Sequence, residues 1–402
     1  MGFDTLGLDS SLLDNLKRLG YNAPTPVQLE AIPAALAGGD LLVSSQTGSG
    51  KTAAFVLPGL ERLRTPSTRA GMGPRMLVLA PTRELAMQVQ KAIHGYCSGQ
   101  KLLTACLVGG VPFGRQLDQV RKPVDIVIAT PGRLMDHLNR GSTDLARVEL
   151  LVLDEADRML DMGFQEELDA ILARAPKERQ TLLFSATLAG VVGRLAGRVT
   201  HNPKRIDVGR REAGCEGSSS LGKPDITQHA LIADDAAHKG RMLESLLREK
   251  EVEQVLVFTA TKRAANELWL SLVGKGHSAG ALHGDMAQTE RTRTLNRLRD
   301  GSMRVLVATD VAARGIDVPG INLVVNYDAP RAAQDYVHRI GRTGRAGRAG
   351  IAVTFLGHAD RHLVRQIERF TGNRVSLMEI PGLEPRARAR DPRRGRFSRA
   401  SH

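Results

Sequence analysis

The chain has 402 residues, of which 42% are apolar and 25% charged, and its formal net charge is +13. This length exceeds what one hydrophobic core usually supports, so two domains of roughly 150 to 200 residues are expected. No apolar run approaches the roughly 18 residues of a membrane span, and the start has neither a secretion signal nor a myristoylation pattern. The three cysteines are too few and too irregularly spaced for a zinc cage or a disulfide framework. We therefore expect a cytoplasmic protein with no membrane partner. The positive net charge indicates that its partner is a polyanion.

Between residues 40 and 206, short apolar runs alternate with stretches of helical periodicity. Continuous apolar runs separated by helices are typical of a parallel sheet that is covered on both faces. The sequence therefore predicts strands within these runs: 41–45, 76–80, 104–110, 125–129, 150–154 and 181–186.

Residues 209–225 break this pattern with Gly, Ser and charged residues, which is typical of an interdomain linker. The alternation then resumes. The second set of predicted strands lies within the runs 254–260, 279–284, 304–310, 323–328 and 350–356.

A last helix is predicted from Leu363, Ile367 and Phe370, which recur at helical spacing, and Gly372 is placed to end it. The fold class is therefore α/β, with two parallel-sheet domains in tandem. Their expected boundaries are 1–208 and 226–374, followed by a C-terminal extension over 375–402.

The stretch SQTGSGKT follows the first predicted strand and precedes a predicted helix, as a phosphate-binding P-loop does. It departs from the usual G-x-x-x-x-G-K-[ST] pattern only in its first residue, which is small. Its two glycines allow the backbone N–H groups to face an anion, the lysine would reach the β- and γ-phosphates, and the threonine hydroxyl would ligate Mg²⁺. An ordinary Gly-Ser turn is the alternative. The nucleotide-binding residues predicted here are Ser45, Gln46, Thr47, Gly48, Ser49, Gly50, Lys51 and Thr52.

Hydrolysis needs a second, acidic site, and LLVLDEAD supplies one at the end of another apolar run. Asp154 would hold Mg²⁺, and Glu155 would orient or deprotonate the attacking water. Acids that favour a helix N-terminus are the alternative interpretation.

With these two motifs and Ser185-Ala186-Thr187 after the next strand, the chain resembles the DEAD-box ATP-dependent RNA helicases, and its short Arg-rich tail resembles those of bacterial members. The resemblance runs from Phe3 to about residue 382 and implies two RecA-like domains. It also implies that Asp157, Ser185 and Thr187 couple the two domains.

Residues Gly20 to Gln28, with Phe3 upstream, resemble the Q motif of this family. The resemblance implies that the amide of Gln28 reads adenine and that an aromatic ring, Phe3 or Tyr21, stacks on it. An amide with paired donor and acceptor suits the N6 and N7 edge of adenine, which favours ATP over GTP. Without the resemblance, Gln28 is expected at the surface.

The second half contains YVHRIGRTGR, with two arginines three residues apart in a Gly-rich segment. Such arginines can grip a triphosphate that the other domain contributes, although a basic surface loop is the alternative. The resemblance identifies Arg342 and Arg345 as arginine fingers, and it implies that His338 contacts the region of Asp157 and Ser185. Hydrolysis should then require closure of the two domains.

Further roles rest on the resemblance and on the order of the motifs. Asp317 in ARGID would approach the ribose. With aromatic residues at 3% of the chain, base stacking cannot be the main grip, so the RNA contact should be to the backbone and independent of sequence. The implied RNA-binding residues are Pro81, Thr82, Arg83, Gly109, Gly110, Thr130, Pro131, Gly132, Arg133, Gln288, Arg291, Thr309 and Arg314.

The last eighteen residues, 385–402, hold seven arginines and one acid, Asp391, and should be disordered. Attraction of phosphates is favoured for this tail over a solubilising role. By analogy with the family, the partners include ribosomal particles or the RNA-degradation machinery. Two rival functions remain: a DNA-translocating helicase, and an RNA-binding scaffold without catalysis.

Overall fold

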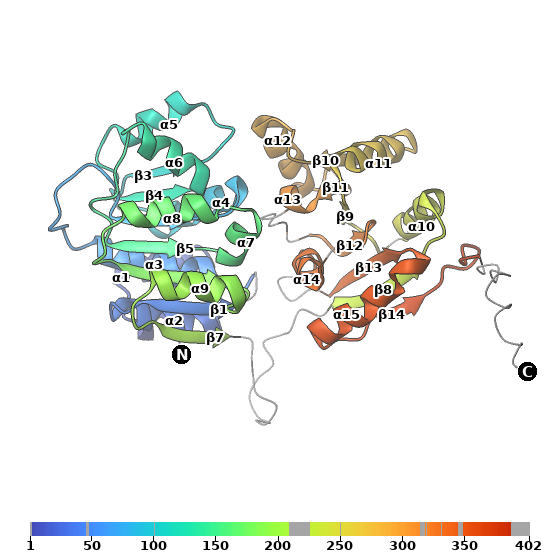
Figure 1. The fold of residues 1–402 in the computed structure, drawn as a ribbon, viewed down its shortest axis with the longest axis horizontal. Coiled ribbons are helices and arrows are strands. Elements are labelled where there is room, and N and C mark those ends of the chain that lie inside the picture. The colour runs from blue at the N-terminus through green and yellow to red at the C-terminus, as the bar shows by residue number, and fades with distance from the viewer. Residues whose placement is uncertain are drawn as a thin grey trace, which may run out of the picture. The chain divides into compact units, whose positions relative to one another are not determined.

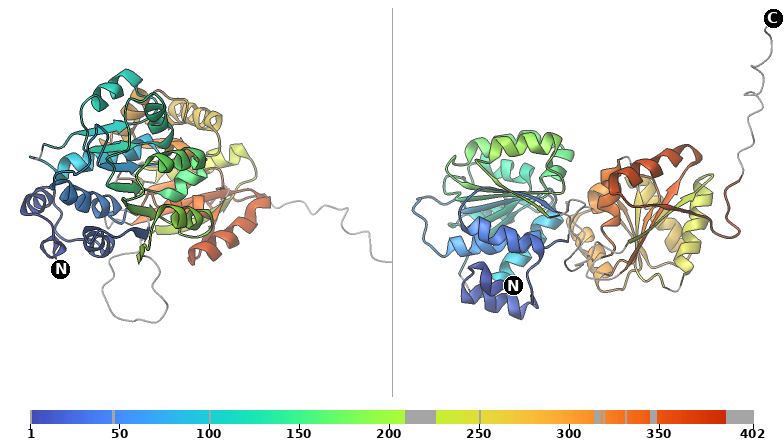
Figure 2. Two further views of the ribbon diagram at one scale, coloured as in Figure 1. Left: turned by 60° about the vertical axis from the view of Figure 1, so that its left-hand side comes forward. Right: turned by 90° about the horizontal axis from the view of Figure 1, so that it is seen from below.

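The computed structural model describes residues 2–45, 48–99, 101–208, 226–249, 251–313, 318, 320–330, 332–344 and 349–386. The chain divides into two compact units, Met1–Ser219 and Ser220–His402. Each unit is built around its own sheet of seven strands, and helices cover both faces of each sheet (Figures 1 and 2). The predicted fold class, α/β with two parallel-sheet domains in tandem, is confirmed.

The first unit alternates strands and helices as the sequence predicts. Its strands are β1 (Leu41–Ser45), β2 (Met76–Leu79), β3 (Thr104–Leu107), β4 (Ile126–Ala129), β5 (Leu150–Leu153), β6 (Gln180–Ser185) and β7 (Lys204–Val208). Its helices are η1 (Phe3–Leu6), α1 (Ser10–Arg18), α2 (Pro26–Leu36), α3 (Lys51–Leu63), α4 (Arg83–Tyr96), α5 (Phe113–Val120), α6 (Pro131–Asn139), α7 (Ala156–Asp161), α8 (Gln165–Arg174) and α9 (Gly190–Val199).

The strands of this sheet are ordered β3-β4-β2-β5-β6-β1-β7, and all of their pairings are parallel. Successive residues of a strand point to opposite faces. Met76 and Val78 of β2 therefore join the core formed with α1 to α4, whereas Leu77 and Leu79 join the core formed with α5 to α9. Burial on both faces explains why the central strands read as unbroken apolar runs.

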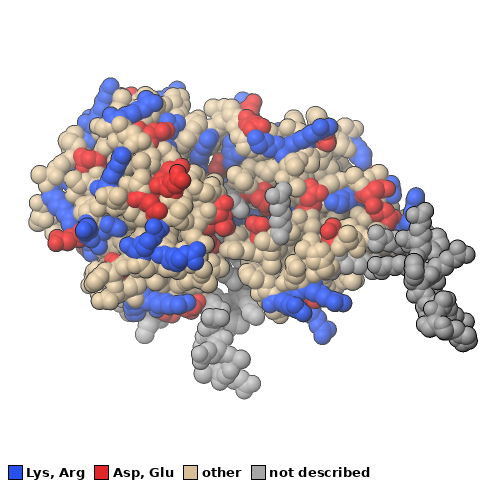
Figure 3. All heavy atoms as spheres, in the orientation of Figure 1, with Lys and Arg blue, Asp and Glu red and all other residues tan. Residues whose placement is uncertain are grey.

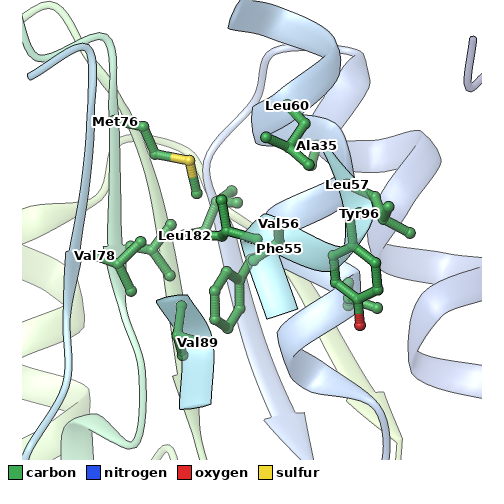
Figure 4. Packing of buried hydrophobic residues seen from close by; sticks show 14 of the residues in the cluster. Ala35, Phe55, Val56, Leu57, Leu60, Met76, Val78, Val89, Tyr96 and Leu182 are labelled. Atoms are coloured by element: carbon green, nitrogen blue, oxygen red, sulfur yellow. The ribbon is translucent and has the colours of Figure 1, made fainter. Parts of the chain in front are cut away.

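Helix α3 packs closely on the sheet, as Figure 4 shows for the cluster around Phe55. The Phe55 and Phe184 rings meet edge to face, with centroids 5.3 Å apart. A Cβ atom on Gly59 would lie 2.6 Å from the sulfur of Met76, so a larger residue at position 59 would require the Met76 side chain to move.

The second unit contains the strands β8 (Ile226–Ile232), β9 (Val255–Thr259), β10 (Ala279–Leu282), β11 (Val305–Thr309), β12 (Leu323–Asn326), β13 (Gly350–Leu356) and β14 (Ser376–Met378). Its helices are α10 (Ala236–Arg248), α11 (Lys262–Gly274), α12 (Gln288–Arg299), α13 (Asp310–Ala313), α14 (Ala333–Ile340), η2 (His358–Asp360) and α15 (Arg361–Thr371). The strand order is β10-β11-β9-β12-β13-β8-β14, again with parallel pairings. Helices α10 and α11 pack on one face, and α12 to α15 on the other.

The structure also differs from the sequence predictions at strand ends. The run 104–110 is a strand only to Leu107, and β7, β8 and β14 had no counterpart among the predicted strands. Strand β14 pairs with β8, so the second sheet continues past residue 374, the predicted end of that domain. The last helix is confirmed: α15 ends at Gly372, which adopts the left-handed conformation with φ 67°. None of the helices in the described part of the chain is long and apolar enough to cross a bilayer.

Candidate functional site: a split row of strand ends

The predicted motifs of the first unit all follow the carboxyl ends of parallel strands, which meet at one edge of the sheet. Along the chain, the three predicted RNA motifs lie together between the P-loop and the acidic motif. In the sheet, β5, β6 and β1, which precede the acidic motif, Ser185-Ala186-Thr187 and the P-loop, are neighbours. Strands β3, β4 and β2, which precede the three RNA motifs, form the other half.

Helix α3 begins at the P-loop, and among the described residues its N-cap position makes no side-chain hydrogen bond to the first N–H groups. Its N-cap residue is Gly50, which has φ 91° and no side chain to donate or accept a hydrogen bond. Gly48 also has a positive φ, 84°. These two left-handed residues suit glycine, and the resulting helix N-terminus is an arrangement that binds phosphate.

Lys51, the first residue of α3, is buried, with 7% of its surface exposed. Burial lowers its pKa, and the negative charges of Asp154, Glu155 and Asp157 partly offset this effect. The lysine of the P-loop therefore lies within electrostatic range of the acidic motif. Thr52, the next residue, is half-buried.

Asp154 follows β5 and is 3% exposed. Burial, followed by the charge of Glu155, raises the pKa of Asp154 to about 7. Its Oδ1 atom is buried and has no hydrogen-bond partner within the described part of the structure. A buried, unpartnered carboxylate oxygen fits a hard cation such as Mg²⁺.

Glu155 adopts a left-handed backbone conformation, with φ 52° and ψ 53°, at the N-cap of α7. A glutamate rarely adopts this conformation, and such strain is concentrated at functional sites. Its Oε2 atom lies 3.0 Å from Nη1 of Arg158, a side chain only 1% exposed. The carboxylate is thus held between the strand end and a buried cation.

The coupling residues lie together on the neighbouring strand end. The backbone N–H of Ala186 donates to Oδ2 of Asp157 at 3.3 Å. The N–H of Thr187 donates to Oγ of Ser185 at 3.3 Å. The predicted coupling residues of this unit therefore form one connected group beside the acidic motif.

Gln28 is only 1% exposed, so the expectation from the residues alone that it lies at the surface is wrong. It lies in the first turn of α2, where its Oε1 accepts from the N–H of Thr25 at 2.9 Å. Its Nε2 donates to the carbonyl of Gly50 at 3.1 Å. A Cβ on Gly50 would come within 2.5 Å of that nitrogen, so the glutamine and the P-loop are in close contact.

The two candidate aromatic residues differ in exposure. Phe3 is 6% exposed and belongs to the core of the first unit, whereas Tyr21 is 37% exposed. The rings meet edge to face at 6.4 Å. Tyr21 is fixed by a 2.9 Å hydrogen bond between its hydroxyl and that of Tyr96. Of the two, Tyr21 is the ring available to a ligand.

The RNA half contains two helices that start at threonines. Thr82 caps α4, because its Oγ1 accepts from the N–H of Leu85 at 3.3 Å. Thr130 is the N-cap of α6 and is followed by Pro131 and Gly132. Pro81, Thr82, Thr130 and Pro131 are buried, and Arg83 and Gly132 are half-buried.

Arg133 does not extend into solvent. Its Nε donates to the carbonyl of Val108 at 3.2 Å, and its Nη2 donates to that of Val111 at 2.9 Å. The Arg83 guanidinium lies against Gly109 and Gly110, because a Cβ on either glycine would crowd it. The three motifs predicted to bind RNA in this unit therefore contact one another around Gly109-Gly110.

In the second unit, Thr309 is the last residue of β11, and Gln288 is the first of α12. Arg291 is only 6% exposed, and its guanidinium donates to the carbonyls of His283, at 3.2 Å, and Ala312, at 3.4 Å. Arg291 therefore holds the loops that follow β10 and β11, and its contact with RNA stays a prediction.

Arg342 is 4% exposed, and its Nε donates to the carbonyl of His338 at 3.3 Å. His338 lies in the last turn of α14, and Arg342 follows the end of that helix at Ile340. The remaining predicted residues, Gln46, Thr47, Arg314, Asp317 and Arg345, lie outside the described residues, as do the linker 209–225 and residues 387–402 of the tail.

Sequence reasoning missed Arg339, which connects the segments that follow β11 and β12. It makes a bidentate ion pair with Asp310, at 2.6 and 2.7 Å, and donates to the Asp328 carbonyl at 2.7 Å. It also missed Gln116, which is fully buried. Each replaces an apolar residue in an apolar helical stripe: Tyr336, Arg339 and Ile340 in α14, and Phe113, Gln116, Leu117 and Val120 in α5. A polar residue within an apolar stripe of a helix therefore indicates a buried side chain with specific hydrogen-bond partners.

His238 of the second unit also has specific partners. It is 2% exposed. Its Nδ1 lies 3.2 Å from the N–H of Asp234, and its Nε2 lies 2.9 Å from the carbonyl of Leu383. It therefore ties the C-terminal extension to the second unit.

Two family models match the chain: DEAD/DEAH box helicase over residues 25–195, and helicase conserved C-terminal domain over 238–347. The ATP-dependent RNA helicase DeaD of Escherichia coli K12 is 44% identical over 95% of this chain and 59% of its own length. The ATP-dependent RNA helicase DBP2 of Eremothecium gossypii is 41% identical over 94% of this chain and 67% of its own. The chain thus spans about three fifths of the length of the DeaD relatives.

Solved structures agree in fold. Saccharomyces cerevisiae Dbp5 bound to RNA and ADP BeF3 matches with a TM-score of 0.82 and 31% identity, over 94% of this chain and 95% of its own. A DEAD box protein from Methanococcus jannaschii is 35% identical, with a TM-score of 0.52, over 94% of this chain and 99% of its own. With its strand-end motifs, two tandem RecA-like sheets and these relatives, the chain belongs to the DEAD-box helicase family.

Proposed function

We propose that the protein hydrolyses ATP in response to RNA, and uses the cycle to separate short RNA duplexes or remodel RNA–protein complexes. The observation that carries this proposal is the uncapped start of α3, with buried Lys51 in the electrostatic field of the acidic motif after β5. A helix N-terminus paired with a buried carboxylate suits a nucleotide triphosphate with its metal ion. The Dbp5 structure bound to RNA and ADP BeF3 supports the same pairing of ligands.

The nucleotide would be ATP. Tyr21 would stack on the base, with Phe3 supporting Tyr21 from the core. The Gln28 amide, which already bonds to Thr25 and Gly50, would contact the edge of the base through its second N–H and the second lone pair of its oxygen. The P-loop amides and Lys51 would hold the phosphates, and Asp317 would approach the ribose. Mg²⁺ would be held by Thr52 and Asp154 and would supply positive charge to the phosphate oxygens.

Hydrolysis would proceed by attack of water on the γ-phosphorus. Glu155 would accept a proton from that water as the new P–O bond forms, and the bond to the bridging oxygen of ADP would break. The buried ion pair with Arg158 would keep the Glu155 carboxylate in place during this transfer. The products are ADP and phosphate.

Arg342 and Arg345 would supply positive charge to the triphosphate when the two units close on RNA, and His338 would contact the group around Asp157 and Ser185. RNA would bind through its backbone at the strand ends of both units. On the face shown in Figure 3, basic and acidic side chains are interspersed. We propose the cytoplasm as the location, and ribosomal particles or the RNA-degradation machinery as partners.

The decisive variant is Arg342→Ala. We expect ATP affinity within about threefold of wild type, while RNA-stimulated turnover falls by about 10³-fold, as for an arginine finger. Nucleotide titration by fluorescence and a phosphate-release assay measure the two quantities. Arg365→Ala, which removes an exposed arginine of α15, is the matched control. Normal hydrolysis by Arg342→Ala would show that the cross-domain scheme is wrong.

Two comparisons separate this function from its rivals. Stimulation of ATP hydrolysis by single-stranded DNA as strongly as by RNA would favour a DNA-translocating enzyme. Deletion of residues 385–402 should retain basal ATP hydrolysis, lower RNA affinity and make binding less dependent on salt, since fewer phosphates are neutralised. Loss of all RNA effects with that deletion would instead favour a scaffold whose tail does the binding.

A further inference from the structure

The segment between β3 and α5 crosses the RNA half of the first unit. It contains Gly109, which is half-buried, and Gly110, which is exposed with φ 76°. Two successive glycines restrict the backbone little, so their conformation must be set by neighbouring groups. Val108 and Val111 flank them, and the contacts that fix the segment are made at these two residues.

Gln116 of α5 makes three of these contacts, and none of its surface is exposed. Its Oε1 accepts from the N–H of Val108 at 3.0 Å. Its Nε2 donates to the carbonyl of Val108 at 2.9 Å and to that of Val111 at 3.1 Å. A single amide therefore uses both of its donors and its acceptor on the two sides of the glycine pair.

Arg133 of α6 reaches the same two carbonyls. Each carbonyl oxygen has two lone pairs, so it can accept from Gln116 and Arg133 together. Both carbonyls therefore point into the protein. Their partial negative charges therefore do not face the exposed side of Gly110. A carbonyl oxygen on that side would repel a phosphate.

We propose that Gln116 is a positioning residue for RNA: it fixes the glycine pair in the shape that receives the RNA phosphodiester backbone. This inference rests on the proposed function, in which Gly109 and Gly110 bind RNA. Gln116 does not touch the ligand, because it is fully buried. It acts through the backbone of Val108 and Val111. Because Gln116 and Arg133 both donate to the carbonyls of these two valines, the loop between them is held in one conformation.

Gln116→Glu is the sharpest test, since glutamate has nearly the same shape, keeps the acceptor and loses both donors when ionised. We expect the KM for a single-stranded oligouridylate, measured by RNA-stimulated ATP hydrolysis, to rise by about tenfold, the effect of losing buried hydrogen bonds. The kcat at saturating RNA should stay within about twofold. Gln116→Ala should shift the same KM in the same direction.

Gln119→Ala is the matched control on the same helix. Gln119 is exposed, and its Oε1 accepts from the N–H of Cys106 at 3.0 Å, away from the glycine pair. We expect its KM for RNA to equal that of wild type.

An unchanged KM for RNA in both Gln116 variants, with wild type stimulated normally, overturns this inference alone. A fall in kcat and melting temperature with an unchanged KM also overturns it, because that pattern describes a purely structural role. A wild-type protein that RNA does not stimulate would overturn the proposed function, and this inference with it.

Discussion

The two units share one strand order, so β8 of the second unit occupies the place of β1 in the first, and α10 that of α3. Their helix starts differ. Helix α3 follows Gly50 and has no capping side chain, whereas α10 follows Asp235, whose Oδ1 accepts from the N–H of His238 at 2.7 Å. The same topology thus contains one helix whose N-cap residue has no side chain, α3, and one whose N-terminus is capped by the Asp235 carboxylate, α10.

The loops before these helices also differ. Gly48 and Gly50 provide two left-handed residues in the first unit, whereas the residues from 233 to 239 include no glycine. A tightly curled, anion-binding loop requires such residues. We infer that the fold places a helix N-terminus after this strand in both units, and that a few loop residues decide whether the helix N-terminus can bind a phosphate.

Lys51→Ala should have the largest effect on the difference between the two units, because it removes the cation at the start of α3. We expect ATP turnover to fall by about 10²-fold or more, as when a group that stabilises transition-state charge is lost. A phosphate-release assay measures this. Lys275→Ala is the control, since Lys275 pairs with Glu244 at 3.2 Å in the second unit. Wild-type turnover in Lys51→Ala would contradict the assignment of the P-loop.

Asp235→Ala opens the start of α10 and should affect stability rather than catalysis. Loss of the N-cap should cost about 1 kcal/mol of unfolding free energy, measured from the urea midpoint of the second unit. We expect no gain of nucleotide binding, because the glycines and lysine of the P-loop are absent there. Asp235→Asn retains an N-cap acceptor and should remain near wild type. An unchanged midpoint in Asp235→Ala would show that the cap contributes nothing.

The pH dependence of stability should be a smaller effect, and it should differ between the units because His137 belongs to the first one. His137 is fully buried, stacks on Phe113 with centroids 4.2 Å apart, and has Nδ1 2.8 Å from Oγ of Ser142. Burial, then the charge of Arg133, lowers its pKa. The unfolded chain therefore takes up a proton first. The stability due to neutral His137 is intact above pH about 6.5 and is lost as the pH falls below that value towards the lower folded-state pKa.

Urea midpoints of the first unit at pH 7.5 and 5.5 test this expectation. Acid should weaken wild type more than His137→Gln, whose amide keeps polar atoms but does not titrate. Equal losses in the two proteins would mean that another group causes the acid sensitivity.

The sequence alone predicted the α/β class, most strand positions and the nucleotide motifs. These features depend on contiguous residues: a buried parallel strand is an apolar run, and a P-loop is a short stretch whose glycines, lysine and threonine act together. The end of α15 at Gly372 was predictable for the same local reason. The exposed β14, by contrast, has only three residues, too few for an apolar run, and it forms a strand because it pairs with β8.

Only the tertiary structure decided which polar side chains face a ligand and which hold the backbone. Gln28 bonds to Gly50, Arg291 to the carbonyls of His283 and Ala312, and Arg339 to Asp310, each a partner that folding brings close. The pairing of β1 with β6, which puts the P-loop on the same half of the sheet as the acidic motif, is likewise absent from the order of the strands in the chain. The physical reason is that a buried polar group must find a partner, and its partner is set by packing rather than by neighbours in sequence.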